Sequence, residues 1–414
     1  MTTAPLVIDH GDVASMLAST LLVLMMIVPG LALFYGGMVR SKNLLSMLSQ
    51  VIGAGAIAMI ACVGWAYSLA FTEGGPLVGS LAKAGLAGID GDTPWALATA
   101  GRAIPELLFA SFQLTFAAIT AALVVGATAE RMRFAAAMLF ALLFVSFVYA
   151  PIAHMVWASD GFIFKLGAID FAGGTVVHVN AGVAGLVAVL FVGRRSGFPK
   201  VAMPPHNLAL ALLGTGLLWV GWFGFNAGSA LEASGLAAVA MLNTLLAPAA
   251  GILTWMAIEA RRAGKPSLLG GASGAIAGLV AVTPAAGISG PLGAMLLGVV
   301  ASGACYSFIT KVKHRAKLDD SLDVFGIHGV GGIVGSIATA VVALPALGGH
   351  AAADYALTHQ LWVQAAAVAV AAGWSGVGSA ILLSAIRLVA RLRPNEEAER
   401  EGLDLSEDGE SAYN

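Results

Sequence analysis

Charge is scarce in this chain of 414 residues. Only 11% of the residues are charged and 58% are hydrophobic, whereas a soluble domain is about a quarter charged and about half apolar. This composition excludes an ordinary soluble domain. The formal net charge of −2 excludes the basic surface that a nucleic-acid partner requires. Mean hydropathy of +0.88 indicates a polytopic membrane protein.

Cysteine and catalytic motifs are scarce as well. The two cysteines, Cys62 and Cys305, both lie in apolar runs and are interpreted as packing thiols. They offer no metal-ligand spacing. There is no HExxH motif and no nucleophile triad, so the sequence predicts neither an enzyme nor a bound cofactor. The N-terminus lacks the basic n-region of a secretory signal, and we expect the first apolar run to span the bilayer itself.

Long apolar runs are abundant, and each is long enough to cross a bilayer as a helix. The predicted fold class is therefore all-α, with eleven transmembrane helices. The predicted spans lie near residues 13–38, 44–71, 106–128, 134–157, 172–193, 207–229, 234–258, 267–284, 290–310, 326–346 and 358–386. The eighth and ninth share one uncharged run that is divided by the turn-like sequence PAAGISGP.

Nearly all of the basic residues lie on one side of these spans, in every second loop of the chain. All but three of the 21 Lys and Arg residues fall on one set of loops and in the C-terminal region; the exceptions are Lys83, Arg102 and Lys165. Cytoplasmic loops carry the excess of Lys and Arg. The sequence therefore predicts an outside N-terminus and a cytoplasmic C-terminus.

The first ten spans divide into two groups of five. A repeat with an odd number of spans must return inverted in the membrane, and inverted repeats are typical of transporters. We expect a transmembrane domain over 1–386, with repeat one at about 13–193, repeat two at about 207–346 and helix eleven at about 358–386. A cytoplasmic tail follows at 387–414.

Two histidines occupy matching places in these repeats. His178 falls in span five and His328 in span ten, each inside a charge-free apolar stretch. An ionisable side chain is costly at bilayer depth, and imidazole can both donate and accept a hydrogen bond. The alternative is a purely structural contact between helices. The matching positions favour a shared polar pathway. Asp170 and Asp323, which lie shortly before the two histidines, are a further, weaker similarity between the two repeats.

Aromatic residues gather toward the outer ends of several spans. Phe112 and Phe116 share one helix face, Trp157 ends span four, and Phe225 is followed closely by Ser229 in span six. An interfacial aromatic belt is the alternative to a cation cage. A bare ion cannot cross an apolar segment cheaply, but an amine-type cation can shed its proton and cross as a neutral molecule.

Asp170 lies where the chain enters span five. It is interpreted either as an acidic group that acts on the substrate or as an anchor at a helix N-terminus, where free N–H groups stabilise a carboxylate.

Several segments together resemble the ammonium transporter family (Amt/Mep/Rh), and the resemblance runs nearly end to end. They are PGLALFYGGMVRSKN, ASFQLTFAAIT, GATAERMRF, PIAHMVW, DFAGGTVVHVNAG, GWFGFNAGS, KPSLLGGASGAIAGLVAVTPAAG and DVFGIHGVGGIVG. The chain is similar above all to the bacterial Amt branch. The resemblance implies ammonium uptake across the cell inner membrane in nitrogen metabolism.

The resemblance implies a role for each matching residue. Phe112, Trp157 and Ser229 match the outer ammonium recruitment site, and Phe116 and Phe225 match a stacked phenyl gate beneath it. The pore histidines correspond to His178 and His328. Asp170 matches an acidic residue with a structural or a deprotonation role. Gln113 lies beside the aromatic pair and is expected to shape the vestibule.

The resemblance also implies partners: ammonium or ammonia, the lipid bilayer, two further copies of the chain in a homotrimer, and a PII-type signalling protein at the cytoplasmic face. The tail EEAEREGLDLSEDGESAYN is similar to the family's C-terminal signature, although Asp408 stands where many relatives have His. Its composition alone also suits an unstructured acidic tail. Ammonium sensing through this tail, gas conduction and an intramembrane enzyme are the competing functions.

Overall fold

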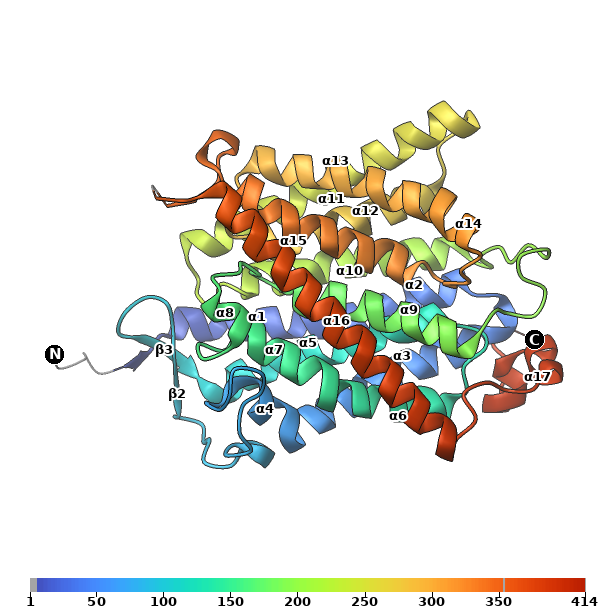
Figure 1. The fold of residues 1–414 in the computed structure, drawn as a ribbon, viewed down its shortest axis with the longest axis horizontal. Helices are drawn as coiled ribbons and strands as arrows, with labels where there is room; N and C mark the ends of the chain where they lie inside the picture. The colour runs from blue at the N-terminus through green and yellow to red at the C-terminus, as the bar shows by residue number, and fades with distance from the viewer. Residues whose placement is uncertain (1–5, 353, 414) are drawn as a thin grey trace.

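The computed structural model describes residues 6–352 and 354–413, which form a bundle of membrane-length helices (Figure 1). Eleven helices in these residues are long and apolar enough to span a bilayer, as the sequence predicts. They are His10–Met38, Ser41–Phe71, Glu106–Thr128, Phe134–Lys165, Gly174–Val192, Leu208–Gly228, Gly235–Ala263, Leu268–Ala285, Pro291–Ala316, Phe325–Val342 and Leu357–Val389.

Many of these spans are composite, because α-helical pieces alternate with tighter or wider turns. The α-helices are α1 (His10–Met25), α2 (Ala32–Met38), α3 (Leu44–Ala61), α4 (Tyr67–Phe71), α5 (Glu106–Val125), α6 (Phe134–Phe144), α7 (Ala150–Trp157), α8 (Phe162–Lys165), α9 (Asn180–Val192), α10 (Leu208–Gly228), α11 (Gly235–Ala263), α12 (Leu268–Val282), α13 (Pro291–Ser307), α14 (His314–Ala316), α15 (Val330–Val342), α16 (Leu357–Val389) and α17 (Glu396–Glu401). The last span therefore continues beyond its predicted end at residue 386.

The wider, π-helical turns occur in the middle of spans as well as at their ends. They are η1 (Met26–Leu31), η3 (Cys62–Ala66), η6 (Val145–Tyr149), η7 (Gly174–Val179), η9 (Phe308–Lys313) and η10 (Phe325–Gly329), and a further one, η12 (Asp404–Asp408), lies in the C-terminal tail. Short 3₁₀ turns are η2 (Ser41–Asn43), η4 (Ala84–Leu86), η5 (Gly126–Thr128), η8 (Thr283–Ala285) and η11 (Pro345–Leu347). Such wide turns inside helices are frequent at functional sites.

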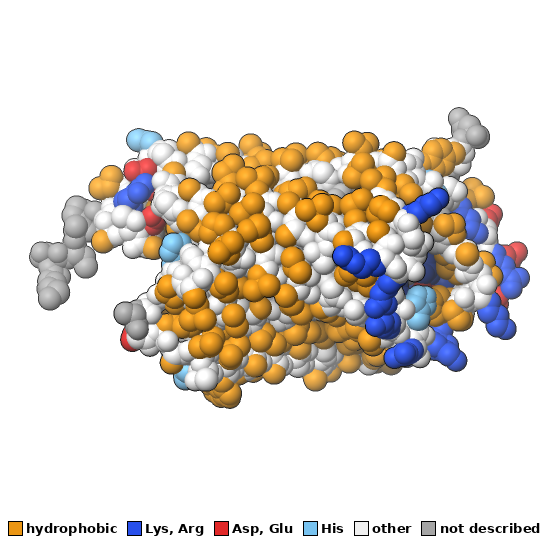
Figure 2. All heavy atoms as spheres, turned by 90° about the horizontal axis from the view of Figure 1, so that it is seen from above, with side chains coloured by type: hydrophobic (Ala, Val, Ile, Leu, Met, Phe, Trp, Pro, Cys, Tyr) orange, Lys and Arg blue, Asp and Glu red, His pale blue; other side chains and the backbone are white. Residues whose placement is uncertain are grey.

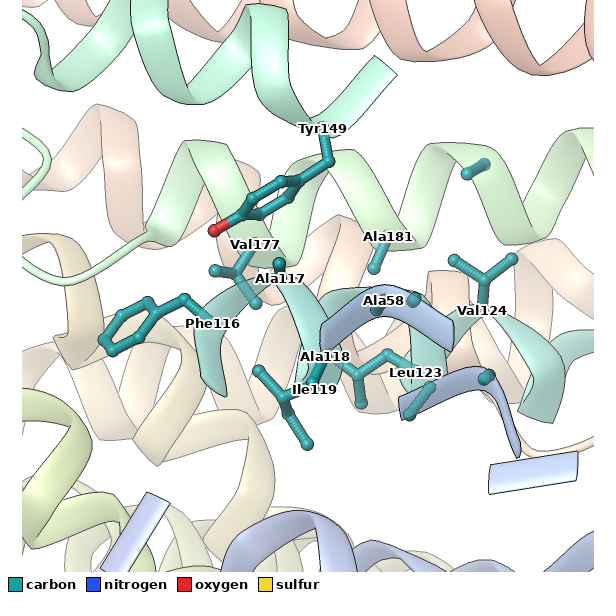
Figure 3. Packing of buried hydrophobic residues seen from close by; sticks show 14 of the residues in the cluster. Ala58, Phe116, Ala117, Ala118, Ile119, Leu123, Val124, Tyr149, Val177 and Ala181 are labelled. Carbon is teal, nitrogen blue, oxygen red and sulfur yellow. The ribbon is translucent and has the colours of Figure 1, made fainter. Parts of the chain in front are cut away.

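Helix α5 lies at the centre of the bundle. It contacts α1, α3 and α9, and most of its side chains are buried. Figure 3 shows Phe116, Ile119 and Leu123 of α5 in one buried cluster with Ala181 of α9 and Tyr149 of η6. Helix α16 instead crosses the outside of the bundle on a diagonal and packs on α9 and α15 (Figure 1). Helix α5 is thus the central element on which the neighbouring helices pack.

The two ends of the bundle differ, and we name them by what they hold. The end with the small β-sheet is the vestibule end, and the end with α17 is the tail end (Figure 1). In Figure 2, hydrophobic side chains cover the middle of the molecule, and Lys and Arg gather at the tail end. This arrangement agrees with the sequence, in which most Lys and Arg residues fall on one set of loops and in the C-terminal region.

The sheet at the vestibule end is formed by β1 (Val7–Ile8), β2 (Pro94–Ala96) and β3 (Arg102–Pro105), in the order β1-β3-β2. Strand β1 is parallel to β3, and β2 is antiparallel to it, with Trp95 opposite Ile104. The sequence analysis did not predict this sheet, because its strands are shorter than a periodic pattern can reveal. The sheet positions Trp95 beside α5.

A network of ion pairs joins the loops at the tail end. Glu130, with a side chain only 1% exposed, lies 2.8 Å from Arg40 and 3.3 Å from Arg195, which also pairs with Asp319 at 2.7 Å. Burial alone would raise the pKa of the Glu130 carboxyl. The guanidinium groups of Arg195 and Arg40 outweigh burial and hold that pKa below its usual value. The network therefore favours the ionised carboxylate.

The C-terminal tail is folded against this end, unlike the unstructured alternative. Asp404 accepts a hydrogen bond from the backbone N–H of Ser46 at 2.9 Å, and Asn43 accepts one from the N–H of Leu403 at 2.9 Å. Farther along, Tyr413 lies 3.0 Å from Nε2 of His206. The tail thus contacts the start of α3 and the segment before α10.

Candidate functional site

A large cavity opens at the vestibule end, and we call it the vestibule. Its volume is about 710 Å³, and its wall includes Phe112, Gln113, Trp157 and Ser229. The sequence-predicted recruitment residues Phe112, Trp157 and Ser229 are therefore brought together from α5, α7 and the end of α10. Ser229 donates its hydroxyl hydrogen to the carbonyl of Phe225 at 2.8 Å, so its oxygen lone pairs can accept a hydrogen bond from a ligand.

The floor of the vestibule is a pair of stacked phenyl rings. Phe116 and Phe225 lie face to face, with ring centroids 4.2 Å apart and an angle of 11° between the ring planes. Phe112 lies 4.8 Å from Phe116 by ring centroids, and Trp157 meets Phe116 edge-on at 5.9 Å. Both stacked rings are fully buried. In this arrangement the rings fill the passage between the vestibule and the interior.

The two histidines lie together directly below this stack. Nδ1 of His178 is 3.2 Å from Nδ1 of His328, and the imidazole rings have centroids 5.2 Å apart. One nitrogen of the pair carries the shared hydrogen and the other accepts it. Nε2 of His178 is buried without a hydrogen-bond partner among the described residues. It remains free to contact a molecule in the passage.

Trp222 lines the cavity around the two histidines, and the sequence analysis assigned it no role. Its ring lies over His178 at 5.4 Å between centroids, and its indole N–H donates to the hydroxyl of Thr283 at 2.9 Å. Its position three residues before Phe225, on the same face of α10, could have predicted this location from the sequence. Trp222 fixes one side of the His178 ring.

Asp170 is held entirely by backbone groups. Its carboxylate accepts hydrogen bonds from the N–H groups of Gly173 at 2.9 Å, Gly174 at 2.6 Å, Thr175 at 2.8 Å and Val176 at 3.1 Å. These are the free donors at the start of the helix that carries His178. The geometry matches the anchoring role that was one of the two interpretations from sequence.

The counterpart of Asp170 in the second half is Asp320 and not Asp323, which the sequence analysis had singled out. Asp320 accepts from the N–H groups of Val324 at 3.0 Å, Phe325 at 2.8 Å and Gly326 at 3.3 Å, at the start of the helix that carries His328. Asp323 instead pairs with Lys313 at 2.5 Å. The two capped helix starts therefore present His178 and His328 in equivalent ways.

Glycines allow these two helix starts to approach closely. A Cβ on Gly182 would collide with the backbone of Gly329, and one on Gly332 would lie 3.0 Å from the backbone nitrogen of Val179. Only small residues permit such contact between membrane helices. The close approach is what brings the two imidazoles within hydrogen-bond distance.

Space below the stack is small. A cavity of about 10 Å³ is lined by His178, His328, Trp222 and Phe225 together with aliphatic side chains. A cavity of about 50 Å³ follows toward the tail end, lined by His328, Tyr35 and Asp323 among others. The first is about the least volume that holds one water molecule. The space around the two histidines is therefore far smaller than the vestibule.

His154 forms a second histidine environment, away from the paired imidazoles. It lies near the end of α7 and is fully buried. Its Nδ1 lies 3.1 Å from the carbonyl oxygen of Ala70, and its Nε2 lies 2.8 Å from that of Gly75. These contacts tie α7 to the end of α4 and to the loop that follows it.

These features define a class of membrane protein: an all-helical transporter with a wide, aromatic entrance and a narrow passage lined by two imidazoles. The model of the Ammonium Transporter Family matches residues 14–413. An ammonium transporter of Aquifex aeolicus is 45% identical over 413 residues, which cover 98% of this chain and 94% of that protein. The chain belongs to the ammonium transporter family.

Solved structures agree with this assignment. The crystal structure of Saccharomyces cerevisiae Mep2 matches with a TM-score of 0.85 at 34% identity, covering 94% of this chain and 88% of that one. A protein described as a sensor Amt protein matches with a TM-score of 0.88 at 27% identity, covering 96% and 98%. The family resemblance inferred from the sequence motifs is confirmed, and the protein is an ammonium transporter and not an enzyme.

Proposed function

We propose that the protein binds ammonium in the vestibule, removes its proton, and conducts ammonia through the passage lined by His178 and His328. Phe112, Trp157 and Ser229 form the binding site, since aromatic faces attract a cation and a hydroxyl oxygen accepts its N–H. The pair Phe116 and Phe225 is the gate. Asp170 holds the helix that carries His178.

One observation carries this proposal: the imidazoles of His178 and His328 meet at 3.2 Å within a nearly closed apolar passage beneath the stacked rings. A charged ammonium would lose its hydration there without a carboxylate to compensate, whereas neutral ammonia needs only a hydrogen-bond partner. The imidazole nitrogens supply that partner.

The test is electrophysiology on proteoliposomes with ammonium, methylammonium and potassium. We expect responses to the first two and none to potassium. The charge moved is then compared with the amount of ammonia delivered. If ammonia passes alone, no charge accompanies it, whereas charge and ammonia move together if the proton crosses by a second route. A potassium current as large as the ammonium current, with both above the current of empty vesicles, would contradict the mechanism.

Orientation and assembly belong to the same proposal. We infer that the vestibule end faces outward across the cell inner membrane and the tail end faces the cytoplasm, which the clustering of Lys and Arg supports. Residues 1–386 are the transport unit, built from two inverted repeats, and 387–414 are the tail. We also propose that the chain assembles as a homotrimer and binds a PII-type partner at the tail end, as the resemblance to the family implies. Cross-linking in membranes tests the trimer, and binding of a PII-type protein to vesicles that expose the tail end tests the partner.

A sensing role is a second proposal, motivated by the likeness to a protein described as a sensor Amt protein. The folded tail, in contact with the start of α3, offers a route from the transport unit to a cytoplasmic partner. A protein that only senses would bind ammonium without flux. Flux in proteoliposomes therefore separates sensing from transport.

A further inference from the structure

The vestibule is far larger than its proposed substrate. It measures about 710 Å³, whereas a water molecule, close in size to ammonium, occupies about 30 Å³ of liquid. The three proposed recruitment residues form only part of its wall. The remainder of the wall contains a second group of aromatic rings and two carboxylates, and these have no role in the mechanism above.

The second aromatic group consists of Phe71, Trp95 and Phe109. Trp95 stacks on Phe109 with centroids 3.8 Å apart and 9° between planes. Phe71 meets Phe109 edge-on at 5.1 Å and Trp95 at 6.4 Å. All three residues line the vestibule. Phe109 covers one face of Trp95, so the rest of that indole is left to the cavity.

This group is anchored from behind. Tyr67 packs against Phe71 with ring centroids 5.5 Å apart, and its hydroxyl donates to Glu106 at 2.8 Å. Glu106 is in turn paired with Lys83 at 2.5 Å. Strand β2 holds Trp95 in register with β3. The rings are therefore a fixed surface, which lowers the entropic cost of binding a ligand against them.

The charge of the vestibule wall has one sign. Glu73 and Asp160 line the cavity, and its described lining residues include no Lys or Arg. Asp160 accepts the N–H of Gly74 at 2.8 Å and lies 3.5 Å from Nε2 of His154. Glu73 forms no hydrogen bond or ion pair within residues 6–352 and 354–413, and it is exposed. A free carboxylate beside aromatic rings attracts cations.

Gln113 gives an independent indication of a ligand. Its side chain is 8% exposed and lines the vestibule, yet its Oε1 has no hydrogen-bond partner in the described residues. Phe109, Phe112, Gln113 and Phe116 are spaced so that they share one face of α5. A buried acceptor without a donor is costly, and a cation that carries N–H groups would satisfy it.

We propose that the outer part of the vestibule is a second cation site, formed by Trp95, Phe71 and the carboxylate of Glu73. Its ligands are ammonium and small alkylammonium ions, whose methyl groups pack on the indole. Gln113 lies one helical turn farther in and receives the N–H groups of an ion that moves from this site to the inner one. The inference rests on the proposed function, because it adds a site before the recruitment residues.

Tetramethylammonium is a suitable probe. It is a cation without a proton to lose, so it cannot cross the passage as a neutral molecule, but it fits an aromatic and acidic site. The measurement is the external tetramethylammonium concentration that halves the ammonium response of proteoliposomes. We expect competitive inhibition of the unmodified protein.

Trp95→Ala should raise that concentration about fivefold, the loss expected for one cation–π contact. Glu73→Gln should raise it by a similar factor at low salt and by less at high salt, because exposed charges are screened. Trp95→Phe, which keeps an aromatic face, should restore most of the inhibition. Trp362→Ala is the matched control, since Trp362 is 60% exposed on α16 and does not line the vestibule. It should change nothing.

The outcomes distinguish the two proposals. If ammonium responses are normal and tetramethylammonium does not inhibit, the second site is refuted and the transport mechanism stands. The second site is also refuted if Trp95→Ala and Glu73→Gln leave inhibition unchanged while Phe112→Leu removes it, because the probe then binds at the inner site. Absence of any ammonium response in the unmodified protein contradicts the proposed function itself.

Discussion

The vestibule and the histidine passage are separated only by the stacked rings of Phe116 and Phe225, yet they are opposite environments. Above the stack lies about 710 Å³ of space with carboxylates and aromatic faces in its wall. Below it lies about 10 Å³ lined by apolar side chains and two buried imidazoles. Under our proposal, the first environment stabilises a cation and the second rejects one. On the proposed mechanism, this difference is what separates ammonium from potassium, since only ammonium can change its charge between the two.

The largest expected effect comes from replacing the two histidines that line the passage. His178→Ala and His328→Ala each remove the polar wall, so we expect the ammonium response to fall about a hundredfold, the scale of a lost proton-transfer group. The measurement is electrophysiology on reconstituted protein. His359→Ala, at the vestibule end of α16, is the control. Unchanged ammonium responses in both variants, with potassium still excluded, would refute the role of the histidines.

The second effect compares the two helix starts that present the histidines. Asp170→Asn and Asp320→Asn replace a carboxylate that accepts several backbone N–H groups, and each should lower the free energy of unfolding by about 2 kcal/mol. Thermal unfolding in detergent measures this loss, with exposed Asp92→Asn as the control. If Asp170→Asn keeps its stability but loses transport, Asp170 acts on the substrate, and the anchoring role is not sufficient.

The third effect weakens the vestibule and leaves the passage intact. Phe112→Leu or Ser229→Ala should raise the ammonium concentration for half-maximal response about fivefold, because each removes one contact to the cation. The maximal response and the exclusion of potassium should persist. A loss of potassium exclusion in these variants would mean that the two regions do not divide the work as proposed.

The smallest effect on transport concerns the tail end, which serves neither region directly. Glu130→Gln should leave the ammonium response unchanged but lower the free energy of unfolding by about 1–3 kcal/mol, because it removes a buried charge that Arg40 and Arg195 contact. The pKa of Glu130 is lowered in the folded protein. Its contribution is therefore present above about pH 4.3, the usual value, and is lost as the pH falls through the folded pKa. Glu397→Gln on the exposed side of the tail is the control for these unfolding measurements.

Most of the fold could be predicted because the bilayer imposes it. A helix that spans hydrocarbon needs a continuous apolar run, so the eleven spans and the break between α12 and α13 are legible in the sequence. The candidate site was predicted from motifs, and residues such as Phe116 and Phe225 do meet in space. The roles of the individual side chains stay predictions until the variants are measured.

Other features could not be predicted, for definite reasons. Asp320 lies as far before His328 as Asp170 lies before His178, yet the sequence analysis compared Asp170 with Asp323. The sequence offers both carboxylates, and only the structure shows that Asp320 meets the free N–H groups while Asp323 pairs with Lys313. The burial of His154 and the aromatic group around Trp95 depend on loops and short strands that carry no periodic signal.

The sequence by itself determined that this chain crosses a membrane eleven times, which side its basic loops share, and that two histidines recur at matching depth. These follow from local hydrophobicity and charge, which each segment carries alone. The tertiary structure decided that the two imidazoles touch, that phenyl rings from α5 and α10 stack above them, and that the vestibule has room for more than one ion. Contacts between residues so far apart in the chain depend on how closely the helices pack, and small residues such as Gly182 and Gly332 permit that approach only in the folded protein.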